Sequence, residues 1–168
     1  QPRSRGLGDV YKRQHVVNYA SAVTWIKSKA LAHDAVYAVE AANTHVAALA
    51  RHELEFGEAM SRFDLICPDG MPLVWSLNAQ LPEGQKLTDR VYGPTLMKET
   101  IAATQDGGAQ YRHFLLGGKD STLTALKQRF AADFPGAEIA GMYSPPFGQW
   151  SREEFEGICR RIRESGAN

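Results

Sequence analysis

The sequence predicts an α/β protein with a mostly parallel sheet and helices on both faces. The first observation behind this prediction is that short β-rich runs alternate with longer segments of helical periodicity. The second is that 168 residues, 43% of them hydrophobic, suffice for one domain with a sizeable core. Alternation of this kind favours parallel strands joined by right-handed crossovers, with the helices covering the sheet.

Four strands and the helices between them account for the chain from residue 15 onward, in a Rossmann-like order. The strands are expected at AVYAV, DLIC, HFLLG and EIAGM, over residues 35–39, 64–67, 113–117 and 138–142. One helix is expected over about 17–31 and a short one over 70–80, GMPLVWSLNAQ. Stripes close to a 3.6-residue period predict the other helices: Val46, Leu49, Phe56 and Met60; Met97, Thr100, Ile101 and Thr104; Leu123, Leu126, Phe130 and Phe134; Phe155, Ile158, Cys159 and Ile162.

The first fourteen residues are expected to be a non-native tail, and residues 15–168 a single α/β domain. Residues 4–14, SRGLGDVYKRQ, match a common transposon-library adaptor translated in one frame. No strand precedes them, and their glycines do not have the G-x-G-x-x-G spacing of a phosphate loop. The tail holds four of the nineteen bases and one of the nineteen acids, so the rest has fifteen bases and eighteen acids, net −3. This charge gives no reason to expect a nucleic-acid partner.

Cysteines and histidines do not predict a metal site. Cys67 and Cys159 lie in apolar patterns without C-x-x-C spacing, and are expected to be reduced core thiols of a cytoplasmic protein. His45 and His52 are seven residues apart, and HELEF lacks the second histidine of a zinc protease motif. No apolar run approaches the roughly 18 to 20 residues that cross a bilayer.

Candidate site residues follow the strands, because ligands of such folds bind outside the carboxyl ends of the strands. Asp69, after the second strand, is open to two interpretations: an active-site carboxylate, or the N-cap of the helix that follows. Gly117 and Gly118 either bring backbone N–H groups toward a diphosphate or form a tight turn. GGKDST is not a nucleotide-binding P-loop, because His113 stands where that motif needs glycine. Arg90, just before a helix, suits either a phosphate contact or a solvent-exposed position.

Five ordered blocks together resemble the WecG/TagA/CpsF family of bacterial glycosyltransferases. They are NTHVAALA (43–50), FDLICPDGMPLVW (63–75), DRVYGPTLM (89–97), FLLGG (114–118) and AGMYSPPF (140–147). The resemblance implies an inverting, metal-independent enzyme with no cofactor. Its substrates would be a UDP-sugar donor, carrying N-acetylmannosamine, its uronic acid or glucose, and a lipid-linked saccharide acceptor on undecaprenyl diphosphate. The products of such enzymes feed teichoic acid, capsule, exopolysaccharide or enterobacterial common antigen synthesis.

The resemblance also implies a role for individual residues. Asp69 matches the catalytic aspartate, expected to accept a proton from the acceptor hydroxyl. Asn43 matches a strand-end asparagine and Arg90 an arginine of the family pattern, and Ala41 stands where members commonly have threonine. The expected substrate-binding residues are Asn43, Arg90, Gly93, Gly117, Gly118, Tyr143 and Pro146.

Further expectations follow from the family pattern. The chain is expected to be a fragment, because RRIRESGAN stops where the family continues into a strand, a G-x-P-K-Q-E block implicated in donor binding, and a membrane-associated appendage. Whether this polypeptide by itself is active is therefore left open. The full-length protein is expected to be cytoplasmic and peripheral to the inner face of the cell membrane, and a homo-oligomer is left open. The alternative is a non-catalytic α/β nucleotide-binding or regulatory module. A receiver domain is disfavoured, because AANTH carries no acids after the first strand.

Overall fold

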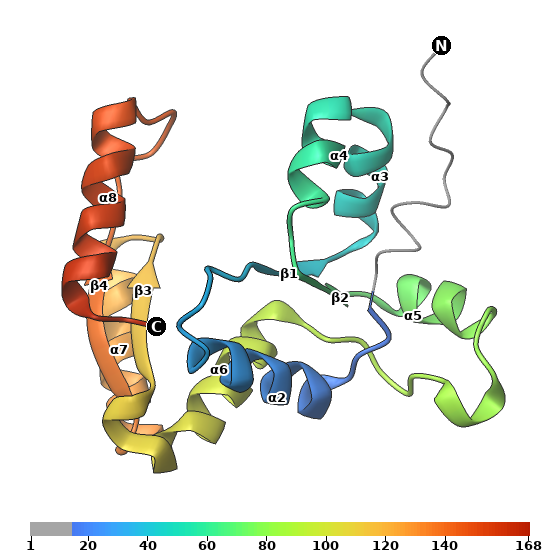
Figure 1. Ribbon diagram of the computed structural model, residues 1–168, viewed down its shortest axis with the longest axis horizontal. Coiled ribbons are helices and arrows are strands. Elements are labelled where there is room, and N and C mark those ends of the chain that lie inside the picture. Colours follow the sequence, from blue (N-terminus) through green and yellow to red (C-terminus); the bar gives the residue numbers. More distant parts are fainter. Residues whose placement is uncertain (1–14) are drawn as a thin grey trace. The chain divides into compact units, whose positions relative to one another are not determined.

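The computed structural model describes residues 15–168, apart from the side chains of residues 108 and 109, and confirms the α/β class. The predicted non-native tail, residues 1–14, lies outside the described residues. The chain divides into two compact units, one comprising residues 15–29 and 34–99, the other residues 30–33 and 100–168 (Figure 1). Each unit contains one pair of parallel strands, so the four predicted strands form two two-stranded sheets. The single domain over residues 15–168 stays a prediction.

The first unit is built on strands β1 and β2, which pair in parallel from Val39 opposite Leu65 to Ala42 opposite Pro68. Its elements in chain order are α2 (Tyr19–Ala30), β1 (Val39–Ala42), α3 (Thr44–His52), α4 (Leu54–Met60), β2 (Leu65–Pro68), α5 (Met71–Asn78), the 3-10 helix η1 (Glu83–Gln85) and the first part of α6 (Gly93–Thr104). Buried side chains from β1, β2, α3 and α4 form one core cluster: Ala42, Ala50, Met60 and Ile66.

Strand β1 begins four residues later than the sequence predicts. The carboxylate of Asp64 accepts a hydrogen bond from the Ala38 backbone N–H (2.8 Å), and the Ala38 carbonyl accepts from the N–H groups of Asp64 and Leu65. These bonds set where pairing with β2 begins. Val36, within the predicted strand, is 98% exposed, so its β-branched side chain has no sheet to pack on.

The predicted stripe from Val46 to Met60 forms two helices rather than one continuous helix. Glu53, between α3 and α4, has extended backbone angles (φ −114°, ψ 109°). The turn lets α4 pack back on α3, and Gly57 comes so close that a Cβ there would lie 2.5 Å from the Ala50 carbonyl oxygen. The apolar stripe is continuous through both helices because both bury it against the same cluster.

The second unit is built on strands β3 and β4, which also pair in parallel. Its elements are the last part of α6, the 3-10 helix η2 (Gln105–Gln110), β3 (Arg112–Leu116), α7 (Asp120–Asp133), β4 (Glu138–Tyr143) and α8 (Arg152–Ser165). The pairing shifts register after His113, which turns Gly141 to the face opposite Ile139. Ile139 packs with the α7 residues of one cluster, whereas a Cβ at Gly141 would lie 3.5 Å from Ser165 of α8. Helices therefore cover both faces of this sheet, as predicted.

Candidate functional site

Asp69 lies directly beyond the carboxyl end of β2. Its backbone N–H donates to the Ala42 carbonyl (2.9 Å), which continues the β1–β2 ladder by one residue. The N-cap of the following helix α5 is Gly70, at φ 148°, and this helix start has no side-chain cap hydrogen bond. Glycine suits this position because a side chain would be strained at that φ. The capping interpretation of Asp69 is therefore wrong, and its carboxylate, 15% exposed, is not held by the helix terminus.

Arg90 supplies a positive charge beside this carboxylate. Its Nη1 lies 3.8 Å from Oδ1 of Asp69, close enough for an ion pair but too long for a hydrogen bond. The next residue, Val91, is fully buried and donates its backbone N–H to the Pro68 carbonyl (2.8 Å), which fixes the Arg90 backbone along the end of β2. The Arg90 side chain is 46% exposed, and its guanidinium makes no hydrogen bond to another described residue.

Asn43, at the carboxyl end of β1, has a structural role that the sequence reasoning missed. It is the N-cap of α3, and its Oδ1 accepts hydrogen bonds from the N–H groups of His45 and Val46, each 3.0 Å long. Asparagine directly before a helix is a common N-cap, so the position in the sequence could have predicted this. The side-chain amide nitrogen has no partner among the described residues, and a substrate contact by Asn43 stays a prediction.

Gly93 begins α6 and faces the end of β1. A Cβ at this position would lie 3.4 Å from the Cβ of Ala41, which is an ordinary but close contact. Ala41 is the position where the resemblance leads us to expect threonine. In this chain the small side chains of Ala41 and Gly93 allow strand end and helix start to approach each other.

In the second unit, Gly117 and Gly118 form a turn between β3 and α7, with φ 100° and 75°. The Gly117 N–H donates to the Tyr143 carbonyl (3.0 Å), and the Ser144 hydroxyl donates to the Gly118 carbonyl (2.6 Å). The tight turn expected as one of two interpretations is thus present. The N-cap of α7, Lys119, makes no side-chain cap hydrogen bond, so the turn also leaves the helix start uncapped by a side chain.

Tyr143 and Pro146, the other predicted substrate contacts, lie at and beyond the end of β4. The ring of Tyr143 has the Arg161 guanidinium carbon 4.8 Å from its centroid. The Pro146 carbonyl accepts a hydrogen bond from the indole N–H of Trp150 (2.8 Å). The structure therefore places the predicted residues in two groups: Asn43, Asp69, Arg90 and Gly93 in the first unit, and Gly117, Gly118, Tyr143 and Pro146 in the second.

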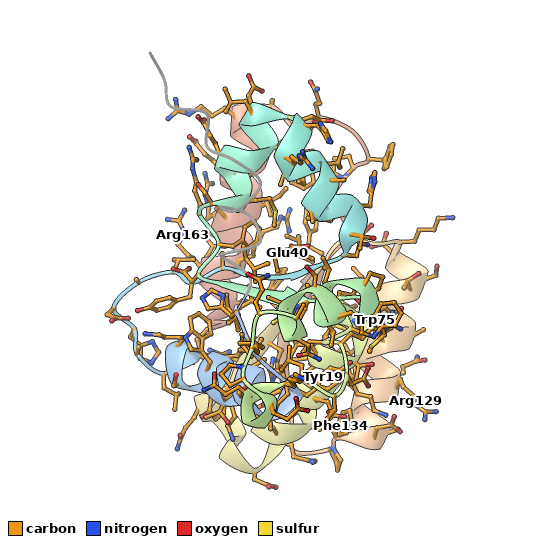
Figure 2. All side chains as sticks on the ribbon, turned by 90° about the vertical axis from the view of Figure 1, so that its right-hand side faces the viewer. Tyr19, Glu40, Trp75, Arg129, Phe134 and Arg163 are labelled. Atoms are coloured by element: carbon orange, nitrogen blue, oxygen red, sulfur yellow. The ribbon has the colours of Figure 1, made fainter. Side chains whose placement is uncertain are left out.

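The ionisable groups of β1 and β2 are perturbed by burial. Burial, and secondarily the negative charge of Glu40, raises the pKa of the Cys67 thiol to about 12. Burial also raises the pKa of the Glu40 carboxyl, whose side chain lies on β1 (Figure 2). Cys67 is fully buried and therefore suits the predicted reduced core thiol rather than a nucleophile.

Two further pKa shifts belong to the second unit. Burial lowers the pKa of His113 on β3, whose Nε2 is 2.8 Å from the buried Thr104 hydroxyl oxygen. Hydrogen bonds from Ser151 lower the pKa of Glu154, because the two residues form a capping box at the start of α8. The two pKa shifts thus come from burial on a strand and from capping of a helix.

Over residues 15–168 no three or more histidine, cysteine, aspartate or glutamate side chains gather in a way that could hold a metal ion. In the same part of the chain, no helix is both long and apolar enough to span a membrane.

Comparison with known proteins agrees with the resemblance seen in the sequence. The model of the glycosyl transferase WecG/TagA/CpsF family matches residues 11–168, which includes all described residues. No curated protein matches the chain.

Proposed function

The chain belongs to the WecG/TagA/CpsF family of glycosyl transferases, and from this premise we propose that it is an inverting enzyme with a UDP-sugar donor. The family acts in cell-surface polysaccharide synthesis. The sugar we propose is N-acetylmannosamine, its uronic acid or glucose. The proposed acceptor is a saccharide linked to undecaprenyl diphosphate, so the reaction would take place at the inner surface of the cell membrane.

Asp69 is the proposed catalytic base. Its carboxylate lies at the carboxyl end of β2, where α/β folds bind ligands, and it is not used as a helix cap. In the reaction, the acceptor hydroxyl oxygen attacks the anomeric carbon on the face opposite UDP. The new C–O bond forms as the bond to the diphosphate oxygen breaks, and UDP leaves with that electron pair. The hydroxyl proton passes to the Asp69 carboxylate.

Arg90 is the proposed electrostatic partner in this step. Negative charge develops on the leaving diphosphate, and a fixed positive charge nearby lowers the barrier. The guanidinium lies 3.8 Å from Asp69 and makes no hydrogen bond to another described residue, so its N–H groups are available to oxygens of a substrate. A planar guanidinium is also well suited to phosphate oxygens.

The proposal assigns no metal or cofactor to the reaction, and this part of it is supported by the family resemblance alone. The remaining substrate contacts are also proposals. Asn43 is proposed from the resemblance, and Gly93, Gly117, Gly118, Tyr143 and Pro146 from their positions in the chain near the ends of the strands. The observation that carries the proposal is the Asp69 carboxylate, free of the helix terminus and paired loosely with Arg90.

A transfer assay tests the function directly. The full-length protein is incubated with each of the three UDP-sugars and an undecaprenyl-diphosphate-linked saccharide, and released UDP and the glycosylated lipid are measured. We expect transfer of one of the sugars with inversion at the anomeric carbon, detected by NMR of the product, and the same rate in EDTA. Binding of UDP without transfer of any sugar would favour the non-catalytic nucleotide-binding module.

A further inference from the structure

The stretch from Arg90 to Tyr92 presents two side chains on the same side. Val91 between them is fully buried and bonds its backbone N–H to the Pro68 carbonyl. The side chains on either side of Val91 are exposed, that of Arg90 at 46% and that of Tyr92 at 41%.

The Tyr92 ring contacts the Arg90 guanidinium. The guanidinium carbon lies 4.9 Å from the ring centroid, within the range of a cation–π interaction. The guanidinium also has a charged neighbour, the Asp69 carboxylate, whose Oδ1 lies 3.8 Å from its Nη1. That pair is too long for a hydrogen bond, so it does not by itself fix the orientation of the guanidinium plane.

Tyr92 is itself held firmly by its backbone. Its N–H donates to the hydroxyl of Tyr19 (2.9 Å), the first residue of α2, labelled in Figure 2. Its carbonyl accepts from the N–H of Leu96 (2.9 Å) in α6. Both backbone polar groups of Tyr92 are therefore hydrogen-bonded, one to each of two helices. These bonds fix the backbone from which the ring projects.

We propose that Tyr92 is a positioning residue that holds the Arg90 guanidinium beside Asp69, and that the Tyr19 hydroxyl fixes Tyr92 in turn. The inference rests on the proposed function, in which Arg90 faces developing negative charge. A long arginine side chain in solvent samples many rotamers, whereas a ring against its guanidinium favours one of them. A charge that is already in place does not have to reorganise during the reaction.

The geometry is tested by NMR on the chain itself, without substrate. The ring should shift the Arg90 side-chain Hδ and Hε resonances upfield. We expect this shift to persist in Tyr92→Phe, which keeps the ring, and to disappear in Tyr92→Leu, which replaces it with an aliphatic side chain. Arg90 resonances that are identical in the parent chain and in Tyr92→Leu would overturn the proposal. As a control, thermal unfolding of each variant is measured to check that the fold is intact.

The role in catalysis is tested by a double-mutant cycle in the transfer assay. We expect Tyr92→Leu to lower kcat by roughly three- to fivefold with little change in KM, about 0.6 to 1 kcal/mol of transition-state stabilisation. Tyr92→Phe, which keeps the ring, should retain the parent kcat. In an Arg90→Ala background, Tyr92→Leu should lower kcat no further, because its effect passes through Arg90.

The cycle separates this proposal from the function on which it rests. If Tyr92→Leu lowers kcat by the same factor with and without Arg90, Tyr92 acts on the substrate directly and the positioning role is wrong, while the enzyme assignment stands. If the full-length protein transfers no sugar, the proposed function is wrong, and the Arg90 resonances still decide whether Tyr92 orients the guanidinium.

Discussion

The Asp69 carboxylate and the Arg90 guanidinium lie 3.8 Å apart, Oδ1 to Nη1, and bring opposite charges together at the carboxyl end of β2. Arg90 is brought there by the buried Val91, whose backbone N–H bonds to the Pro68 carbonyl. The backbone, rather than the ion pair, therefore sets where the Arg90 side chain starts. We therefore expect the pair to contribute little to the free energy of unfolding.

Replacing Arg90 should affect activity much more than stability. Ion pairs with an exposed partner contribute at most about 1 kcal/mol, so Arg90→Gln should change the free energy of unfolding by less than that. If the guanidinium stabilises the leaving diphosphate, kcat should fall by roughly 10²-fold. The kcat of Arg90→Lys should lie between those of the parent and of Arg90→Gln, because lysine keeps the positive charge but not the planar guanidinium. The control is Arg129→Gln, which removes a surface pair with Asp133 on α7 and should leave kcat unchanged.

Two glycine-to-alanine changes should have opposite effects on stability. A Cβ at Gly57 would lie 2.5 Å from the Ala50 backbone oxygen, so Gly57→Ala should force α3 and α4 apart and cost about 1 to 3 kcal/mol. A Cβ at Gly157, within α8, would have no atom within 4 Å, so Gly157→Ala should stabilise by about 0.5 to 1 kcal/mol. Urea unfolding measures both, and a stable Gly57→Ala variant would contradict the close packing of the two helices.

Glu40 should destabilise the protein at neutral pH. Burial raises its pKa above the ordinary 4.5, so the folded state holds this proton more tightly than the unfolded state does. Stability from this group is therefore full at low pH and falls as pH rises from 4.5 through the folded-state value. Glu40→Gln should raise the free energy of unfolding at pH 7 by less than about 1 kcal/mol, since the side chain is partly solvated. The exposed Glu58→Gln is the control, and an equal gain there would show that burial is not the cause.

His113 should give the opposite pH dependence. Burial lowers its pKa below the ordinary 6.5, so the unfolded state binds the proton more readily. Stability is then unaffected above pH 6.5 and falls as pH drops from there through the folded-state value, by at most about 1.4 kcal/mol per pH unit. His113→Gln keeps a donor for the Thr104 hydroxyl but has no titrating group. Unfolding measured from pH 7.5 to 5 should show a shallower decline in this variant, and equal slopes would contradict the assignment.

The order of the elements could be predicted from the sequence, because apolar periodicity reports which faces are buried. The first and last residues of the helices and strands depend on individual contacts, which apolar periodicity does not predict. Strand β1 begins later than predicted, where the Ala38 N–H bonds to the Asp64 carboxylate. The predicted helix is interrupted by the extended backbone of Glu53, although the apolar stripe continues on both sides. Pairing of four strands into two separate sheets depends on long-range contacts, which local patterns leave undetermined.

For the candidate site, the sequence predicted the position of Asp69 but left its role open. The structure removes the cap interpretation, because Gly70 occupies the N-cap. The opposite happened at Asn43, whose capping bonds were missed. Tyr92, proposed above as a positioning residue, was not among the residues singled out from the sequence, although it lies two residues from Arg90 in DRVYG and its ring contacts the guanidinium. That contact could not be predicted from the sequence, because it depends on the burial of Val91 between the two residues.

The central claim, that Asp69 is the catalytic base, is tested most directly by the turnover rate of Asp69→Asn. Asparagine keeps the shape of the side chain but cannot accept the acceptor proton. Since Asp69 is no cap, the free energy of unfolding should change by less than about 0.5 kcal/mol. UDP-sugar binding should persist, and Asp133→Asn on α7 should turn over at the parent rate. We expect kcat of Asp69→Asn to fall by roughly 10² to 10⁴, whereas turnover at the parent rate would show that the base lies elsewhere.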